Sequence, residues 1–286
     1  MEIKLTFMSG AGNIFTVIDN RTYKISKEVF GKAASILCGG GDLPLPKTEG
    51  LIILNKGNDK YHFISEFFNP DGSNSAMCGN GGRCAVWFAL YEHFFEAQNN
   101  PIKFWMANSE YSAEFNKDMV RLKFPSPIEI KSKIEVTLNN KIIKAGYVDV
   151  GADHLVINFD DFPFTENHEL EDFDILSIAP KLRYHPNFMP AGVNVNFYKV
   201  ANENTILLRT YERGVEGETG ACGTGAISTA LVSAYNDETG FPVKIIPTSG
   251  IPLYVDVNYN ISAGIEFVTL EGSAEITGSQ TIQIEL

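Results

Sequence analysis

The sequence predicts an α/β protein of the α+β type, with two pseudo-symmetric domains that each wrap a curved, mostly antiparallel sheet around one central helix. The main observation is a near-repeat: Met77–Gly82 and Ala221–Ala226 share a Cys-Gly-x-Gly core and lie about half a chain length apart. An apolar stretch of helical character follows each copy. Short alternating apolar segments otherwise dominate, which favours sheets around single helices over a doubly wound parallel sheet. We therefore expect two similar halves, each presenting one cysteine at a helix start, with the active site in the cleft between them.

The expected elements follow from the spacing of apolar residues along the chain. In the first half, strands are expected at residues 1–7, Leu51–Leu54, Tyr61–Phe68, Tyr111–Phe115 and Val120–Phe124. In the second half, they are expected at Lys141–Val150, Leu155–Phe159, Val193–Val200, Thr205–Tyr211, Val243–Pro247, Ile251–Val257, Ile265–Leu270 and Thr281–Leu286. Helices are expected at Lys27–Leu37, Gly82–Phe95, Glu169–Ala179 and Gly225–Tyr235.

A domain boundary is expected at Pro125-Ser126-Pro127, where two prolines interrupt the strand pattern. The near-repeat supports this position, because each half runs through strands to its Cys-Gly turn and then enters a helix. Residues 1–124 are therefore assigned to an N-terminal domain and residues 125–274 to a C-terminal domain.

Composition limits the classes of partner that the protein is expected to bind and the compartment in which it is expected. The net charge of −12 argues against nucleic acid or an anionic membrane surface as a partner. The sequence has no run of about twenty apolar residues and no signal-peptide core at its start. Without a secretion signal, the four cysteines are interpreted as free thiols in a reducing compartment, so the cytoplasm is expected.

The two Cys-Gly-x-Gly repeats are the candidate catalytic segments. Their glycines let the backbone approach a ligand, and the helix that follows places about half a positive charge at its N-terminus. Such a site suits a carboxylate or a phosphate, and it also lowers the pKa of a thiol below the free value of about 8.5, which we expect for Cys78 and Cys222. One thiolate can then remove a proton from a carbon while the other thiol protonates its opposite face. This chemistry needs no cofactor, and no cluster of cysteines and histidines suggests a metal site.

Four segments, in this order, are similar to the diaminopimelate epimerase family over nearly the whole chain. The first contains a Gly-x-Gly-Asn-x-Phe pattern, the second and fourth resemble the two cysteine signatures of the family, and the third is similar to its second-domain asparagine strand. They are Ser9–Asp19, Asn69–Cys84, Gly192–Val195 and Tyr211–Gly225.

The resemblance implies a reaction, a fold detail and a set of roles. The reaction is the cofactor-independent conversion of LL-2,6-diaminopimelate to the meso form, a step of lysine and cell-wall synthesis, with Cys78 and Cys222 as alternating acid and base. The last strand, within residues 275–286, is expected to return to the N-terminal domain. The carboxylate at the reacting carbon would be held by Gly79, Asn80, Gly223 and Thr224, with Asn13 lining the same pocket. The far amino-acid end would be held by Asn69, Asn194, Glu212 and Arg213, with Arg213 binding its carboxylate and Glu212 its ammonium.

Several of these residues also have ordinary structural explanations. Asn13 and Asn69 stand beside glycines and are typical of turns. Glu212 and Arg213 could form a surface ion pair of little consequence. Arg83, although part of the signature, is expected to be solvated in a first helical turn and is not included among the site residues.

Two departures from the family pattern leave alternatives open. The family has a Gly-Asn-Pro-His-like turn where this chain has Ala152 and Asp153, so an amide is missing and a negative charge is added near a group that would meet a carboxylate. The loop Gly39–Gly50 is longer than in the family and carries two prolines. A racemase of another amino acid on the same fold, a carboxylate-based isomerase of the phenazine-biosynthesis type and a non-catalytic binding module therefore remain alternatives. The partner is expected to be a small amino-acid substrate, and a homodimer is left open.

Overall fold

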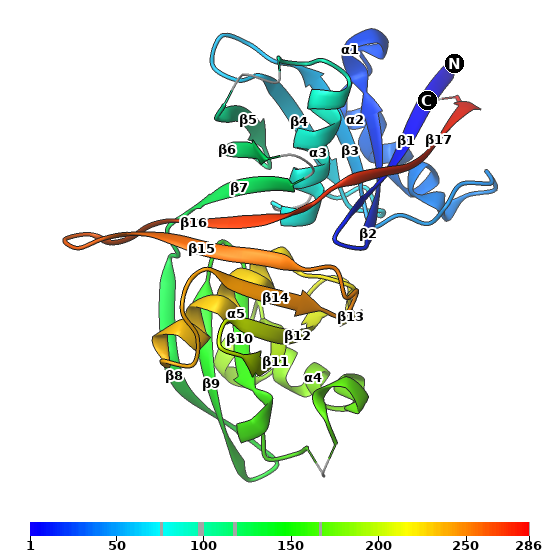
Figure 1. Cartoon of the computed structure of the whole chain (residues 1–286). Coiled ribbons are helices and arrows are strands. Elements are labelled where there is room, and N and C mark those ends of the chain that lie inside the picture. Colours follow the sequence, from blue (N-terminus) through cyan, green and yellow to red (C-terminus); the bar gives the residue numbers. More distant parts are fainter. Residues whose placement is uncertain (75–76, 97–99, 117–118, 166–167, 286) are drawn as a thin grey trace. The chain divides into compact units, whose positions relative to one another are not determined.

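The computed structural model describes residues 1–74, 77–96, 100–116, 119–165 and 168–285, and it separates into two units (Figure 1). Unit 1 consists of Met1–Lys123 together with Glu271–Leu286, and unit 2 consists of Phe124–Leu270. The sequence prediction placed its limits after residues 124 and 274. Leu286, the last residue of the predicted final strand, lies outside the described residues.

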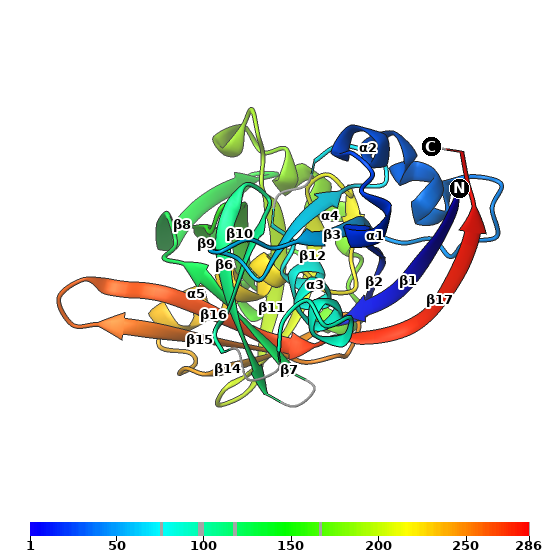
Figure 2. The same cartoon turned by 90° about the horizontal axis from the view of Figure 1, so that it is seen from above.

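Unit 1 contains one sheet whose hydrogen-bonded order is β17-β1-β2-β3-β4-β5-β6-β7. The pairs β2–β3 and β4–β5 are parallel, and the others are antiparallel. The C-terminal strand β17 lies beside β1 in both views (Figures 1 and 2). The strands are β1 (Glu2–Gly10), β2 (Asn13–Asp19), β3 (Leu51–Lys56), β4 (Phe63–Phe68), β5 (Ile102–Met106), β6 (Ser109–Asn116), β7 (Met119–Pro125) and β17 (Glu275–Gln283). The helices are α1 (Asn20–Tyr23), α2 (Lys27–Ser35), the π-helical turn η1 (Ile36–Gly40) and α3 (Gly79–Tyr91).

Unit 2 contains the hydrogen-bonded order β8-β9-β10-β11-β12-β14-β15, with the short β13 paired to the end of β12. The pairs β10–β11 and β12–β14 are parallel. The strands are β8 (Glu129–Leu138), β9 (Lys141–Asp149), β10 (Asp153–Asn158), β11 (Asn194–Asn202), β12 (Thr205–Glu212), β13 (Gly217–Glu218), β14 (Val243–Pro247) and β15 (Leu253–Asn260). Strand β16 (Gly264–Ser273) begins in unit 2 and its last three residues belong to unit 1. The helices are α4 (Ile175–Arg183), α5 (Gly223–Tyr235) and the 3-10 turns η2 (Phe159–Asp161), η3 (Leu170–Asp172) and η4 (Pro186–Phe188).

The two units repeat the same sequence of strand pairings. Each passes through two antiparallel pairs, then a parallel, an antiparallel, a parallel and a further antiparallel pair. A parallel pair needs a crossover connection, and each parallel step here contains a helix: α2 and α3 in unit 1, α4 and α5 in unit 2. In both units the cysteine of the repeat stands at the start of the second crossover helix. The predicted fold of two pseudo-symmetric, mostly antiparallel halves is therefore confirmed.

Each sheet carries helices on both faces because its strands are apolar on both sides. In β1, Ile3 and Leu5 pack with Phe30 of α2, while Gly10, on the alternate face, contacts α3. In unit 2 the residues of β10 that pack with α4 belong to a phenylalanine-rich cluster. On the other face α5 approaches β9 closely, since a Cβ at Gly146 would lie 2.5 Å from a side-chain atom of Val232.

Both central helices are buried almost all around, as their sequences require. The first eight residues of α3 are all buried, and α5 lacks charged residues over its whole length. A helix that is apolar around its full circumference is stable only inside a core. No helix of the described residues combines the length and apolar character needed to cross a bilayer.

Several predicted boundaries were wrong. The helix expected at Glu169–Ala179 begins instead at Ile175, after a separate 3-10 turn, and continues through Pro180 to Arg183. Helix α3 begins at Gly79 rather than Gly82. The strands β2, β5 and β8 were not predicted. In β8 charged residues alternate with apolar ones along an exposed strand, so the stretch lacks the apolar content on which the prediction relied.

Candidate active site

Cys78 is the N-cap residue of α3. Its backbone is extended, with φ −98° and ψ 116°, and its Sγ accepts a hydrogen bond from the backbone N–H of Gly81 at 3.4 Å. The backbone oxygen of Cys78 accepts from the N–H of Gly82 at 2.8 Å, which begins the helix. The cysteine side chain is half-buried, while Gly79 and Asn80 behind it are buried. A thiol in this position faces the positive end of the helix, where a thiolate is favoured.

A close approach between β1 and α3 places Asn13 near this turn. Strand β1 turns into β2 through Ala11 and Gly12, both with positive φ, and Gly10 pairs with Asn13 across the hairpin. A Cβ on Gly10 would lie only 2.7 Å from the backbone oxygen of Asn80, so only glycine lets the strand and the helix start meet. Asn13 and Asn80 therefore lie at the same corner of unit 1.

Arg83 corrects an expectation. It was set aside as a solvated residue of the first helical turn, yet it is fully buried. Burial lowers the pKa of its guanidinium to about 10. A charged residue four positions into a helix start gives no sequence signal of burial, so only the structure identifies it.

Cys222 occupies the matching position at the N-cap of α5 but has a different environment. It is only 6% exposed, its Sγ lies 3.6 Å from Oγ1 of Thr224, and its backbone oxygen accepts from the N–H of Ala226 at 2.9 Å. Burial, and then the negative charge of Glu212, raise the pKa of the Cys222 thiol well above its ordinary value. The expectation that both cysteines are unusually acidic is therefore wrong for Cys222, because burial outweighs the helix N-terminus.

Glu212 lies beside this thiol. Burial raises the pKa of the Glu212 carboxyl, and hydrogen bonds from Thr219 and Cys222 oppose that rise. The hydroxyl of Thr219 donates to Oε1 of Glu212. The sequence analysis assigned Glu212 to the far end of a substrate, whereas the structure places its carboxyl group in contact with Cys222.

Arg213 and Asn194 form a second polar group in unit 2. The side-chain oxygen of Asn194 accepts from the backbone N–H of Arg213 at 2.9 Å, and its amide donates to the backbone oxygen of Asp153 at 2.9 Å. Nη1 of Arg213 donates to Oδ2 of Asp153 and to the backbone oxygen of Gly192, both at 3.0 Å. The hydroxyl of Tyr147 donates to Oδ1 of Asp153 at 2.6 Å. The guanidinium expected to bind a substrate carboxylate is thus already paired with a carboxylate of the protein.

Asn69 lies in unit 1, in the loop that leads to Cys78. Its side-chain amide donates to Oγ of Ser73 at 2.9 Å, and its backbone oxygen accepts from the N–H of Gly72 at 2.9 Å. Oδ1 of Asp71 accepts from both the N–H and the hydroxyl of Ser73. These bonds give Asn69 a turn-forming role in the described structure.

A buried polar network that the sequence analysis did not predict supports the start of α5. Nδ1 of His154 lies 3.0 Å from the amide nitrogen of Asn196, whose side-chain oxygen accepts from Oγ1 of Thr210 at 3.0 Å. A Cβ on Gly225 would lie 2.5 Å from that same oxygen, so the helix rests directly on the network. Burial lowers the pKa of His154 to about 3. The histidine is therefore neutral, and because Asn196 donates to Nδ1, its proton is on Nε2.

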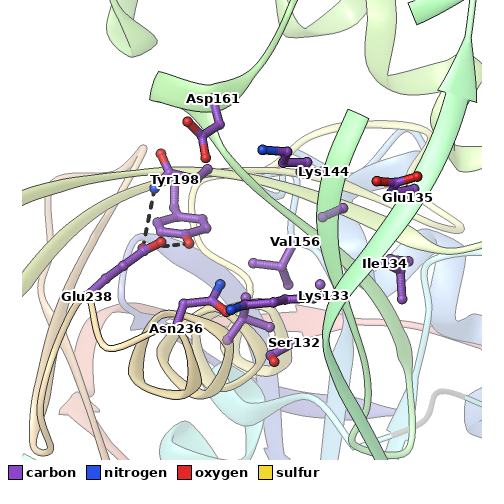
Figure 3. A pocket seen from close by; sticks show the side chains of 14 residues that line it. Ser132, Lys133, Ile134, Glu135, Lys144, Val156, Asp161, Tyr198, Asn236 and Glu238 are labelled. Carbon is purple, nitrogen blue, oxygen red and sulfur yellow. Dashed lines mark hydrogen bonds between the residues drawn. The ribbon is translucent and has the colours of Figure 1, made fainter. Parts of the chain in front are cut away.

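A separate hollow lies elsewhere in unit 2. It has a volume of about 810 Å³ and is lined by residues of β8 to β11 and of the C-terminal end of α5 (Figure 3). In it the hydroxyl of Tyr198 donates to Oε2 of Glu238 at 2.8 Å, and the amide of Asn158 donates to the same oxygen at 3.3 Å. None of the 14 residues drawn in Figure 3 is a cysteine or a predicted site residue. The candidate chemistry therefore rests on the two capped helix starts and not on this hollow.

The comparisons with known proteins agree over most of the chain. The model of the family described as diaminopimelate epimerase matches residues 5–118 and 146–258. The diaminopimelate epimerase of Aquifex aeolicus (strain VF5) is 36% identical over 282 residues, covering 93% of this chain and 92% of that protein. That of Chlorobaculum tepidum is 32% identical over 283 residues, covering 97% of this chain and 100% of that protein. The chain belongs to the diaminopimelate epimerase family.

Several solved structures resemble this chain in their fold. A phenazine biosynthesis protein of the PhzF family from Enterococcus faecalis aligns with a TM-score of 0.70 at 13% identity, covering 99% of this chain and 100% of that one. A probable proline racemase from Agrobacterium radiobacter K84 aligns with a TM-score of 0.70 at 15% identity, covering 99% of this chain and 93% of that one. At these identities the likeness shows a shared fold and nothing about substrate.

Proposed function

We propose that this protein interconverts LL- and meso-diaminopimelate by cofactor-independent proton exchange at one α-carbon. The observation that carries the proposal is the pair of helix-capping cysteines at equivalent positions of two duplicated units, in a chain of the diaminopimelate epimerase family. Relatives that carry this name align over almost their whole length.

The environments of the two cysteines support different starting states. Cys78 is half-buried and accepts a backbone hydrogen bond at a helix N-terminus, which suits a thiolate base. Cys222 is buried beside Glu212, and its raised pKa keeps it a protonated thiol at neutral pH. In this proposal Cys78 takes the α-proton and Cys222 delivers its own proton to the opposite face, so the two groups end with their protonation states exchanged. The reverse reaction starts from the exchanged states.

The backbone at the two helix starts can stabilise the charge that develops when the α-proton leaves. The carboxylate of the reacting carbon would face the N–H groups that follow each cysteine, with the side chains of Asn80 and Thr224 as further donors. Donors arranged in advance at a developing enediolate are worth about 2.7–4 kcal/mol each in comparable sites. Asn13 would line the same pocket, and Asn69, Asn194 and Arg213 would bind the far end. Glu212 would bind an ammonium group beside Cys222.

The four free thiols support a reducing compartment, and we propose the cytoplasm. The experiment that tests the proposed function follows the α-proton of diaminopimelate by proton NMR in D2O, using freshly reduced protein. We expect the signal to disappear with wild-type protein and to persist with the Cys78→Ala, Cys222→Ala double variant, whereas each single variant loses the interconversion of the LL and meso forms. Cys38→Ala is the matched control, because Cys38 is a buried thiol of the unit 1 core.

Two results would contradict the proposal in different ways. Exchange on another amino acid of a panel, with none on diaminopimelate, would keep the two-thiol chemistry and replace the substrate. Full exchange by the Cys78→Ala, Cys222→Ala double variant would reject the thiol mechanism.

A further inference from the structure

Arg83 is buried without a carboxylate partner among the described residues. Its side chain is 0% exposed, and the structure records no ion pair between it and an Asp or Glu of the described chain. The guanidinium instead donates to backbone and amide oxygens: Nη1 to Gly79 at 3.3 Å, Nη2 to Oδ1 of Asn80 at 2.6 Å, and Nε to Ser273 at 3.5 Å. Burying a charge without a counter-charge costs free energy, so the burial of the Arg83 guanidinium needs a physical explanation.

The position of the guanidinium gives that explanation. The side chain folds back along α3, so its charged group contacts the two residues that directly follow Cys78. Arg83 and Cys78 interact electrostatically, and the other titratable group in the same interaction is the buried thiol of Cys84. A thiolate at Cys78 would be the missing counter-charge.

Charged groups on the elements packed against α3 lie away from its first turn. On β1 and β2, Lys4 pairs with Glu92 at the C-terminal end of the helix, and Asp19 pairs with Arg21, which itself donates to the backbone oxygen of Glu92. On β3, Lys56 is exposed. On β4, whose Phe67 lies against Gly81, Glu66 pairs with Lys27. On β7, whose Leu122 lies against Gly82, Arg121 and Lys123 are exposed. On the segment that contributes Ser273, Glu271 pairs with Arg121 and Glu275 is exposed. Among the described residues, Arg83 is therefore the charge that these contacts place at the turn of Cys78.

The same contacts fix the orientation of an amide. A guanidinium only donates hydrogen bonds, so the atom of Asn80 that faces Arg83 must be its side-chain oxygen. The amide nitrogen of Asn80 consequently points away from Arg83. This is the group needed if Asn80 is to hold a substrate carboxylate.

We propose that Arg83 is a positioning residue of the Cys78 site, whose buried guanidinium orients the amide of Asn80 and supplies the positive charge that favours the thiolate of Cys78. The part of this inference that concerns the substrate carboxylate rests on the proposed function. The part that concerns the thiolate can be tested without any substrate.

The test measures the rate at which iodoacetamide alkylates Cys78 as a function of pH, with mass-spectrometric peptide mapping to identify the cysteine. An opposite charge within a few ångströms lowers a pKa by about one unit or more. We expect Arg83→Gln and Arg83→Met to raise the pH midpoint of Cys78 alkylation by about one unit, which slows the reaction at pH 7 about tenfold. Arg83→Lys keeps the charge and is expected to restore the midpoint.

The matched control is Arg121→Gln, which removes an arginine of the same unit that is paired with Glu271, and it is expected to leave the midpoint unchanged. Circular dichroism and thermal unfolding establish that each variant is folded. In the folded neutral variants we also expect a higher KM for diaminopimelate, because the Asn80 amide is no longer held.

An unchanged midpoint in a folded neutral variant would overturn the proposal, as would Arg83→Lys behaving like Arg83→Gln. Failure of both neutral variants to fold would count against it as well, because Arg83 would then act on structure alone. The outcomes separate this inference from the proposed function. A shifted midpoint in a chain that does not exchange the α-proton of diaminopimelate would uphold the role of Arg83 in thiolate formation and reject the function.

Discussion

Replacing Asp153 by asparagine is expected to improve the binding of diaminopimelate. Asp153 pairs with Arg213 at 3.0 Å and also accepts from Tyr147, so its charge sits on the guanidinium that would bind the far carboxylate of the substrate. An asparagine can still accept hydrogen bonds through its side-chain oxygen, but it does not repel a second carboxylate. The guanidinium is then paired with one carboxylate, that of the substrate.

The magnitude follows from Coulomb's law and from exposure. Two carboxylates that share one guanidinium would lie about 6 Å apart, where their repulsion is about 0.7 kcal/mol in water and about 3 kcal/mol at an effective dielectric constant of 20. Both Asp153 and Arg213 are 29% exposed, so solvent screening favours the lower part of this range. We take about 1 kcal/mol, which corresponds to a KM about fivefold lower with an unchanged kcat.

The assay is the D2O exchange of the α-proton at several diaminopimelate concentrations, which yields KM and kcat separately. Asp160→Asn is the matched control, because Asp160 is an aspartate of the same unit whose carboxylate lies 3.8 Å from Lys199. The control is expected to leave both constants unchanged. A KM that rises in Asp153→Asn would refute the reasoning, since it would mean that Asp153 holds Arg213 in place or binds the ammonium group itself.

Three further predictions follow from the geometry. Gly10→Ala places a Cβ 2.7 Å from the oxygen of Asn80, so we expect a kcat/KM at least about tenfold lower and a loss of about 1–3 kcal/mol in urea unfolding. His154 is neutral in the folded state with a pKa of about 3, so the unfolded state binds more protons as pH falls below 6.5. Stability is therefore expected to fall by about 1 kcal/mol per pH unit between about pH 6 and pH 4 relative to His154→Gln, measured by urea unfolding. Iodoacetamide at neutral pH is expected to label Cys78 before the buried Cys222, as shown by peptide mapping.

Each of these predictions has a result that would contradict it, and the glycine variant has a matched control. Gly31→Ala adds a Cβ 3.4 Å from Phe68, an ordinary contact in a helix, and should not destabilise the protein; an equal effect of both glycine variants would reject the close-approach argument. A wild-type pH slope in His154→Gln would mean that His154 is not the group that titrates. Faster labelling of Cys222 would reverse the proposed starting states of the two thiols.

Much of the fold could be predicted from spacing along the chain. The duplicated cysteine motif indicated two similar units, and the scarcity of helices indicated sheets around single helices. Helix α4 was misplaced because the acidic run at Glu171–Asp174 resembles a first helical turn, while packing against the phenylalanine-rich core of unit 2 begins only at Ile175. Strand β8 was missed because it is an exposed strand whose stability comes from pairing with β9 rather than from apolar content.

For the candidate site, too, some residues could be predicted from the sequence and others could not. The sequence could nominate both cysteines, the asparagines and the Glu212-Arg213 pair as site residues, because these residues lie within continuous motifs. It did not reveal the network of His154, Asn196 and Thr210, whose members come from three different strands.

The sequence by itself determined the duplication, the two helix-capping cysteines and membership of the diaminopimelate epimerase family, since all three depend on residue types at short spacings. Only the tertiary structure decided that Arg83 is buried, that Asp153 pairs with Arg213, and that burial next to Glu212 raises the pKa of Cys222. The physical reason is that burial and charge pairing depend on which segments pack together. Arg83 contacts Ser273, Asp153 meets Arg213, and the cost of ionising a thiol is set by everything that excludes water from it.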